Sequence, residues 1–267
     1  MHRSLMLVSL SACAGLVAPF VANPAKAGGG APEGPSASAE VEAVLDRLER
    51  AGDRIADLKA EVSYEVLDTL IDDKQLKPGR IMYRKADPNA QFFVEFTGVR
   101  QEGVIIDKKE WYAFDGRWLT EAHETTRNVI KREIVAEGER LNPFRLGEGP
   151  FPLPFGQKKD ETLANFAVTL VPQEAGDPPD TEHLLCTPLE GTQMADEYRQ
   201  LDLYVDRKLD LPIKIVADNK KDNKKVTVTF TNMRLNTGIA GSAFQFKAPA
   251  GWPAPTVERL SRDASGR

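Results

Sequence analysis

The chain has 267 residues, of which 41% are hydrophobic and 28% are charged, an ordinary soluble composition with room for one large or two small domains. Its formal net charge of −5 argues against a nucleic-acid-binding protein, because such proteins usually carry a basic excess.

The N-terminal 27 residues are typical of a secretory signal peptide. A short basic start precedes the apolar run SLMLVSLSACAGLVAPFV, and AKA at 25–27 is a small-residue cleavage pattern. We therefore expect a signal peptide over 1–27 and an exported protein. Two alternatives stay open. The run could remain as a membrane anchor, or LSAC at 10–13 could be a lipobox that leaves the chain lipid-anchored through Cys13.

A flexible linker and one amphipathic helix follow. Residues 28–38, GGGAPEGPSAS, have the composition of a linker. From Val41 to Leu58, apolar residues recur at three- and four-residue spacing, which predicts a helix with Ser38 as its N-cap.

From residue 61 the apolar pattern changes to a period of two, which predicts strands. EVSYEV at 61–66 alternates, and ten further segments are strand candidates: 79–85, 91–98, 103–107, 110–114, 117–135, 166–172, 182–188, 199–206, 212–218 and 224–236. Residues 107–109, 115–116, 206–208 and 222–223 have turn composition. The pattern indicates about eleven strands in an antiparallel meander, with a helix before it.

The longest interruption of the strand pattern, at 137–167, contains GPFPLPFG at 149–156. Its three prolines disfavour a helix interior or a central strand, yet three large apolar side chains separate them. A short helix is expected over 160–166, and 253–267 has the composition of a polar tail.

Several strands are apolar on both faces, including QFFVEF, WYAF and HLLC. Such strands could line a cavity, or they could pack against a second core layer made by the short helices. Cys186, within HLLC, is expected to be a buried and inert thiol.

No motif for catalysis or metal binding stands out. HETTR at 123–127 lacks the second histidine of a zinc-protease helix, GEG at 147–149 has no following helix or lysine, and no G-x-S-x-G is present. We therefore expect neither an enzyme nor a cofactor nor a metal. KKDNKK at 220–225 is expected to be a solvated turn, or one that touches anionic headgroups.

The order of several motifs resembles the periplasmic outer-membrane lipoprotein carriers of the LolA type, within the LolA/LolB superfamily. The resemblance covers about 40–252. It is carried by the helix and strand VLDRLERAGDRIADLKAEVSYEV, the hairpin VIIDKKEWYAFD, the late strands LDLYVDRKLDLPIKIVAD and the closing AFQFKAPAGW.

This resemblance implies a half-barrel domain over 39–252, an incomplete antiparallel β-barrel of about eleven strands with an N-terminal helix and short lid helices. It implies a periplasmic carrier, acting as a monomer, that binds acyl chains of lipoproteins or lipids in an apolar cavity and ferries them towards the outer membrane. Its partners would be an inner-membrane transporter and an outer-membrane receptor.

The resemblance also implies candidate residues for the cavity and its lid: Phe93, Trp111, Phe114, Phe144, Leu146, Phe151, Leu153 and Phe155. Arg84 and Lys85 compete for the place of the family's lid-controlling arginine, because Pro88 is displaced from its usual position after that residue. The segment around 149–156 could instead be a structural clamp on the outside of the barrel.

Two other functions are open at this stage. The chain could be an envelope-stress sensor or adaptor of the same superfold that binds a partner protein, or a hydrolase on a similar scaffold. The sequence alone names neither the cargo nor the partners.

Overall fold

The computed structural model of the chain describes residues 38–139 and 158–260. The described residues form the helices α1 (Ala39–Arg54), α2 (Lys159–Asn165) and α3 (Gln193–Glu197) and the 3-10 helix η1 (Gly241–Phe244). Twelve strands accompany them: β1 (Asp57–Asp68), β2 (Asp73–Arg84), β3 (Gln91–Gln101), β4 (Val104–Phe114), β5 (Trp118–His123), β6 (Asn128–Glu133), β7 (Phe166–Val171), β8 (Thr181–Pro188), β9 (Tyr198–Asp206), β10 (Leu211–Asn219), β11 (Lys224–Leu235) and β12 (Thr256–Glu258).

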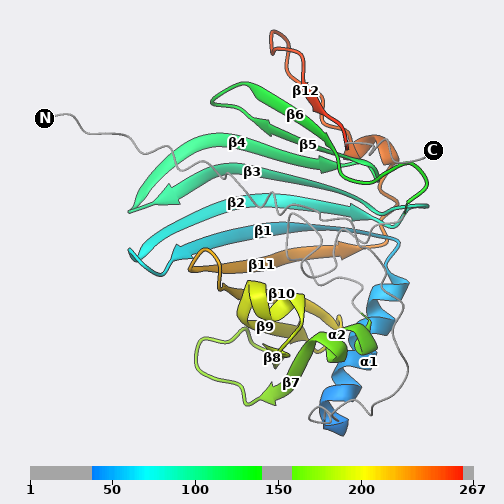
Figure 1. Cartoon of the computed structure of the whole chain (residues 1–267), viewed down its shortest axis with the longest axis vertical. Helices are drawn as coiled ribbons and strands as arrows, with labels where there is room; N and C mark the ends of the chain where they lie inside the picture. The colour runs from blue at the N-terminus through cyan, green and yellow to red at the C-terminus, as the bar shows by residue number, and fades with distance from the viewer. Residues whose placement is uncertain (1–37, 140–157, 261–267) are drawn as a thin grey trace, which may run out of the picture. The chain divides into compact units, whose positions relative to one another are not determined.

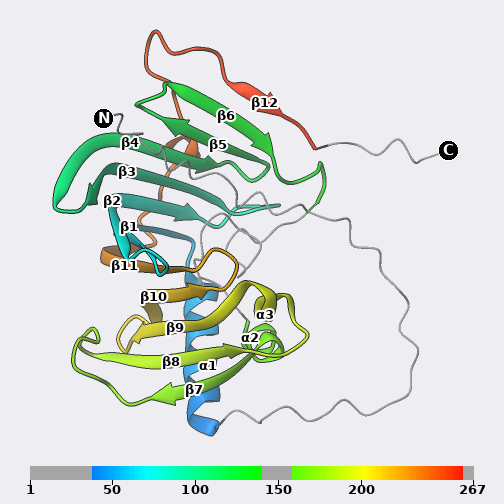
Figure 2. The same cartoon turned by 60° about the vertical axis from the view of Figure 1, so that its left-hand side comes forward.

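All twelve strands belong to one curved, open sheet (Figure 1, Figure 2). Their order is β12-β6-β5-β4-β3-β2-β1-β11-β10-β9-β8-β7, with β12 and β7 as the two edges. Every neighbouring pair is antiparallel except β12 and β6, which are parallel. The predicted fold class, mainly β with an incomplete antiparallel barrel and an N-terminal helix, is confirmed as an open sheet.

Four details of the predicted elements were wrong. The helix ends at Arg54, and Leu58, expected within it, lies in β1. Residues 117–135, expected as one strand, form the hairpin of β5 and β6. Residues 107–109, expected to form a turn, lie inside the continuous strand β4, and the chain reverses instead at Glu102 and Gly103, both at positive φ. The strand β12 lies within 253–267, where the sequence suggested only a polar tail. Three residues are too few for an alternating pattern to be recognised.

The helix α1 covers the inner face of the sheet at its β7–β10 end (Figure 1). We call the face that carries α1 the inner face, and the opposite one the outer face. Ser38 caps the helix as predicted, its hydroxyl oxygen accepting from the N–H of Val41 at 3.3 Å. The buried side of the helix then joins the main core through Val41, Val44, Leu45, Leu48 and Ala51.

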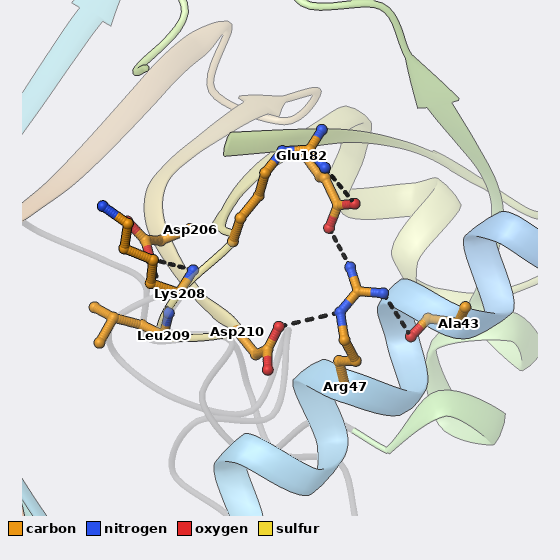
Figure 3. Close-up of polar contacts among 8 residues, drawn as sticks. Ala43, Arg47, Glu182, Asp206, Lys208, Leu209 and Asp210 are labelled. Atoms are coloured by element: carbon orange, nitrogen blue, oxygen red, sulfur yellow. Dashed lines mark hydrogen bonds and ion pairs between the residues drawn. The ribbon is translucent and has the colours of Figure 1, made fainter. Parts of the chain in front are cut away.

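Arg47 also fastens α1 to the sheet (Figure 3). Its Nε donates to Asp210 Oδ1 at 3.1 Å, in the turn between β9 and β10, and its Nη2 pairs with Glu182 on β8. Two acceptors from separate elements therefore fix the helix against this end of the sheet, in a geometry that suits the forked guanidinium.

The outer face is covered by the chain's own C-terminal segment. After β11, η1 brings Phe244 against Phe93 and Ala113 in a second buried cluster, while Phe246 and Trp252 pack on the ring of Trp111. β3 and β4 thus bury their outer face beneath this segment, while their inner-face side chains belong to the main core cluster.

A buried carboxylate holds the start of that segment. Asp57, at the beginning of β1, accepts from the N–H groups of Thr237, Gly238 and Ile239 at 2.8, 2.8 and 3.3 Å. Burial by itself raises the pKa of the Asp57 carboxyl, but these hydrogen bonds outweigh it and hold the pKa below the ordinary value.

Cys186 has the environment that the sequence predicts. It is buried in the main core, and burial raises the pKa of its thiol to about 12. At neutral pH the thiol is protonated and therefore a poor nucleophile.

We predict that Asp57→Asn destabilises the fold in a pH-dependent way. The folded pKa lies below the unfolded value of about 3.9, so the carboxylate stabilises the protein above that pH and loses this effect as the pH falls through the folded pKa. In urea unfolding at pH 7, Asp57→Asn should lower the free energy of unfolding by about 1.5–3 kcal/mol, the range for hydrogen bonds to a charged group. The deficit should shrink towards pH 3. The exposed Asp53→Asn is the control, and an equal deficit for both variants would contradict the anchoring role.

Candidate functional site

The inner face of β1 to β5 is the candidate site. All three α-helices lie beside the β7–β10 end of the sheet (Figure 1, Figure 2), and β2 to β5 extend away from them. On this part of the inner face the side chains are buried and largely aromatic. Phe92 and Phe114 have ring centroids 5.5 Å apart, and Phe96 lies 5.7 Å from Tyr64 and 6.2 Å from Tyr112.

Strand register arranges these side chains in rows across the sheet. One row is wholly apolar or aromatic: Leu58, Tyr83, Phe92, Phe114 and Leu119. The next contains Ala60, Ile81, Val94 and Tyr112. Burial raises the pKa of Tyr83 to about 12 and also raises that of Tyr112, as expected for phenols in an apolar setting. Apolar surface therefore dominates the part of the face near the start of β1.

Towards the β1–β2 and β3–β4 turns the same face becomes polar. Lys77 Nζ lies 2.6 Å from Glu110 Oε2, and the two side chains are only 4% and 8% exposed. The ammonium also lies 5.8 Å from the centre of the Phe96 ring. We call Tyr64, Lys77, Glu110 and His123 the polar end of the inner face, since register places Tyr64 beside Lys77 and Glu110 beside His123.

A second lysine approaches the buried pair from the rim. Lys108 Nζ is 3.9 Å from Glu110 Oε1, and its side chain is 35% exposed. Burial lowers the pKa of Lys77, with Glu110 opposing that effect and Lys108 adding to it. Two ammonium groups thus share one carboxylate in the described part of the chain.

The described side chains of the site place an apolar surface beside a charged cluster. Within residues 38–139 and 158–260, no group of three or more His, Cys, Asp or Glu side chains could hold a metal ion. An apolar face with a charged cluster at one end suits an amphiphilic ligand.

The residues that the sequence singled out do not come together. Phe114 lies on the inner face, whereas Phe93 and Trp111 lie on the outer face beneath the C-terminal segment. The three side chains therefore do not line one surface. The sequence does not reveal this, because in a strand that is apolar on both faces the pattern does not show which alternate residues point to which face. Phe144, Leu146, Phe151, Leu153 and Phe155 lie outside the described residues.

Of the two basic candidates, Arg84 is partly buried and Lys85 is exposed. Arg84 Nη2 donates to Gln91 Oε1 at 2.8 Å, and its guanidinium carbon lies 5.7 Å from the ring centre of Phe244. The side chain sits so close to Gly241 that a Cβ there would lie 2.8 Å from Nη2. The described contacts of Arg84 are therefore with β3 and η1. The contact expected with residues 140–157 falls outside the described residues.

Sequence reasoning missed the pair formed by Lys77 and Glu110. The signal was present, since Lys77 alternates in phase with the buried Ile81, and Glu110 in phase with Tyr112 and Phe114. A charged residue at a core-facing position of a strand indicates a buried partner.

Solved structures similar to this chain exist at low sequence identity. An uncharacterised conserved protein from Thermus thermophilus is 13% identical, with 83% of this chain and 99% of that chain covered and a TM-score of 0.46. MucB in its complex with MucA from Pseudomonas aeruginosa is 16% identical (79% and 62% covered, TM-score 0.44), and a LolA superfamily protein from Nitrosomonas europaea is 11% identical (77% and 97%, TM-score 0.35).

At identities of 11–16%, these structures do not place the chain in a specific family. No protein-family model matches the chain, and no curated protein matches it. No helix formed by the described residues is both long and apolar enough to cross a membrane.

We predict that removing one charge of the buried pair destabilises the fold more than removing both charges. Lys77→Met leaves the Glu110 carboxylate buried without its close partner and should lower the free energy of unfolding by about 3 kcal/mol. Lys77→Met combined with Glu110→Leu removes both charges and should come close to the parent stability. Urea unfolding of the two variants checks this. A single variant as stable as the double variant would show that the pair is solvated.

Proposed function

We propose that the chain is a carrier that binds acyl chains of lipoproteins or lipids on the inner face of β1 to β5. The observation that carries the proposal is the contrast between the two parts of this face. The β7–β10 part packs against α1, whereas the strands β2 to β5, whose register forms the apolar rows, lie beyond all three α-helices (Figure 2).

Acyl chains fit such a surface because their burial is favourable and undirected. Each methylene taken out of water contributes about 0.8 kcal/mol, without requiring a specific polar contact. A surface of Ile, Val, Phe and Tyr side chains can therefore hold chains of differing structure, which a carrier needs.

The cellular setting of the proposal rests on the sequence. A signal peptide over 1–27 and motifs resembling the LolA-type carriers favour a periplasmic protein that moves its cargo towards the outer membrane. The proposed activity consumes no cofactor and involves no catalysis. An inner-membrane transporter and an outer-membrane receptor are the proposed partners.

The test is a variant that fills the apolar rows. Ala60, buried on the inner face between Leu58 and Val62, is replaced by Phe. Binding of a fluorescent acyl probe should weaken at least tenfold, since the added ring occupies the surface on which the acyl chain of the probe would lie. The matched control is Ser63→Phe, which places the same ring on the outer face of β1.

The two variants are compared at equal folded fraction, measured by circular dichroism. Equal probe binding by Ala60→Phe, Ser63→Phe and the parent protein would contradict the proposed site. Absence of probe binding by the parent protein would contradict the carrier function itself.

A second candidate, an adaptor that binds a partner protein, is favoured by two exposed hairpin turns. Leu70 and Ile71, in the β1–β2 turn, are 73% and 72% exposed, and Ile105 near the β3–β4 turn is 63% exposed. Gln101 Nε2 donates to Asp73 Oδ2 at 2.9 Å and links the two hairpins. Exposed aliphatic groups gathered in this way are typical of interaction surfaces.

We predict that Leu70→Ser with Ile71→Ser leaves acyl-probe binding unchanged, because both residues lie outside the apolar rows. If the adaptor function holds, a photo-crosslinker at position 105 should yield one defined adduct in cells, and the double variant should lose it. An adduct that persists in the double variant would show that the β1–β2 turn is not part of that surface.

A further inference from the structure

We infer that the polar end of the inner face binds the anionic oxygen group of a lipid, a carboxylate or a phosphate, while the acyl chain lies along the apolar rows. This inference rests on the proposed function and specifies its ligand: an acyl chain with an anionic head rather than a neutral one.

The first step is the placement of polar and apolar groups along the same strands. On β4, Glu110 and Phe114 lie on the same face four residues apart, which corresponds to about 13 Å at roughly 3.3 Å per residue. On β2, Lys77 stands in the same relation to Ile81. A lipid that lies along the strands would therefore place its acyl chain among Ile81, Val94 and Phe114 and its head group beside Lys77.

The second step is the charge count at the polar end. Glu110 has two ammonium partners, Lys77 at one oxygen and Lys108 at the other. Neither lysine forms an ion pair with any other carboxylate in the described part of the chain. The cluster thus carries one positive charge more than its carboxylate balances.

Other charged groups facing this end are already paired or lie farther along. On β5, Glu121 pairs with Arg132 of β6, and Arg132 also pairs with Glu258 of β12. Near the turns, Asp73 accepts from Gln75 and Gln101. His123 packs its ring edge-to-face with Tyr112 at 6.2 Å. None of these groups forms an ion pair with Lys77 or Lys108.

The third step is the hydrogen-bonding capacity of Lys77. An ammonium has three donors, and the described residues supply one close acceptor, Glu110 Oε2. The side chain is almost fully buried, so its other donors are removed from bulk water. An anionic oxygen placed beside Lys77 and Lys108 would accept from both ammonium groups and supply the missing negative charge.

The experiment compares three ligands with the same chain on the full-length mature protein: dodecanoate, dodecyl phosphate and the neutral monododecanoyl glycerol. Calorimetric titration at pH 8 keeps both anionic heads ionised. We expect at least one of the anionic ligands to bind tenfold or more tightly than the glycerol ester. The two anionic ligands distinguish carboxylate from phosphate as the preferred head.

The decisive variant is Lys108→Gln, which removes the rim ammonium and leaves the buried pair intact. It should weaken anionic binding at least fivefold and leave glycerol-ester binding unchanged. The matched control is Lys109→Gln, the next residue, whose side chain is exposed. Combining Lys77→Met, Glu110→Leu and Lys108→Gln removes all three charges and should also abolish the preference for an anionic head.

The outcomes separate this inference from the proposed function. Equal affinity for all three ligands, or an anionic preference that survives both Lys108→Gln and the triple variant, overturns the head-group site and leaves the carrier intact. No binding of any ligand to the parent protein overturns the carrier function as well. Equal losses in Lys108→Gln and Lys109→Gln would show a general charge effect and would also overturn the inference.

Discussion

The rest of the structure depends on one constraint: a sheet whose strands are apolar on both faces must keep both faces from water. On the outer face, the chain does so with its own C-terminal segment, which places Phe244 against Phe93 and is held at its start by Asp57. On the inner face, α1 supplies the cover at the β7–β10 end, where Arg47 fastens it to β8 and to the turn before β10 (Figure 3). The helix is only 16 residues long, so it covers one end of a twelve-stranded sheet.

Because α1 covers only one end of the inner face, the apolar rows of β2 to β5 are left outside its cover. They belong to the same core cluster as the residues under α1, yet lie beyond the α-helices. Across these rows the side chains change from Phe92 and Phe114 at one end to Lys77 and Glu110 at the other. A buried ion pair is a weak source of stability, because desolvation offsets its attraction. The proposed binding of an amphiphile would give this pair a role on an apolar face.

Much of the fold could be predicted from the sequence because the relevant signals are local. Ser38, the three- and four-residue spacing after it and the alternation in EVSYEV determine α1 and β1. The prediction failed where local composition misled. Asp107, Lys108 and Lys109 resemble a turn, but the reversal occurs at Glu102 and Gly103, where the backbone adopts positive φ.

The candidate site could be predicted only in part, because it depends on which face each residue takes. Phe93 and Phe114 are equally apolar in the sequence, and only the pairing of β3 with β4 places them on opposite faces. The contact between Lys77 and Glu110 joins β2 and β4 across β3, so no spacing along the chain reveals it. The covering of the outer face by η1 likewise depends on a segment about 150 residues from β3 in the chain.

The central claim is that the ligand lies on the inner face of β1 to β5, and methyl NMR of the mature protein tests it most directly. During titration with a dodecyl amphiphile, the account predicts chemical-shift changes for the methyl groups of Val62, Ile81, Val94 and Leu119, whose side chains are buried on this face. The methyl groups of Leu70, Ile71 and Ile105 should not shift. Changes confined to those three exposed residues, or no changes at saturating ligand, would contradict the account.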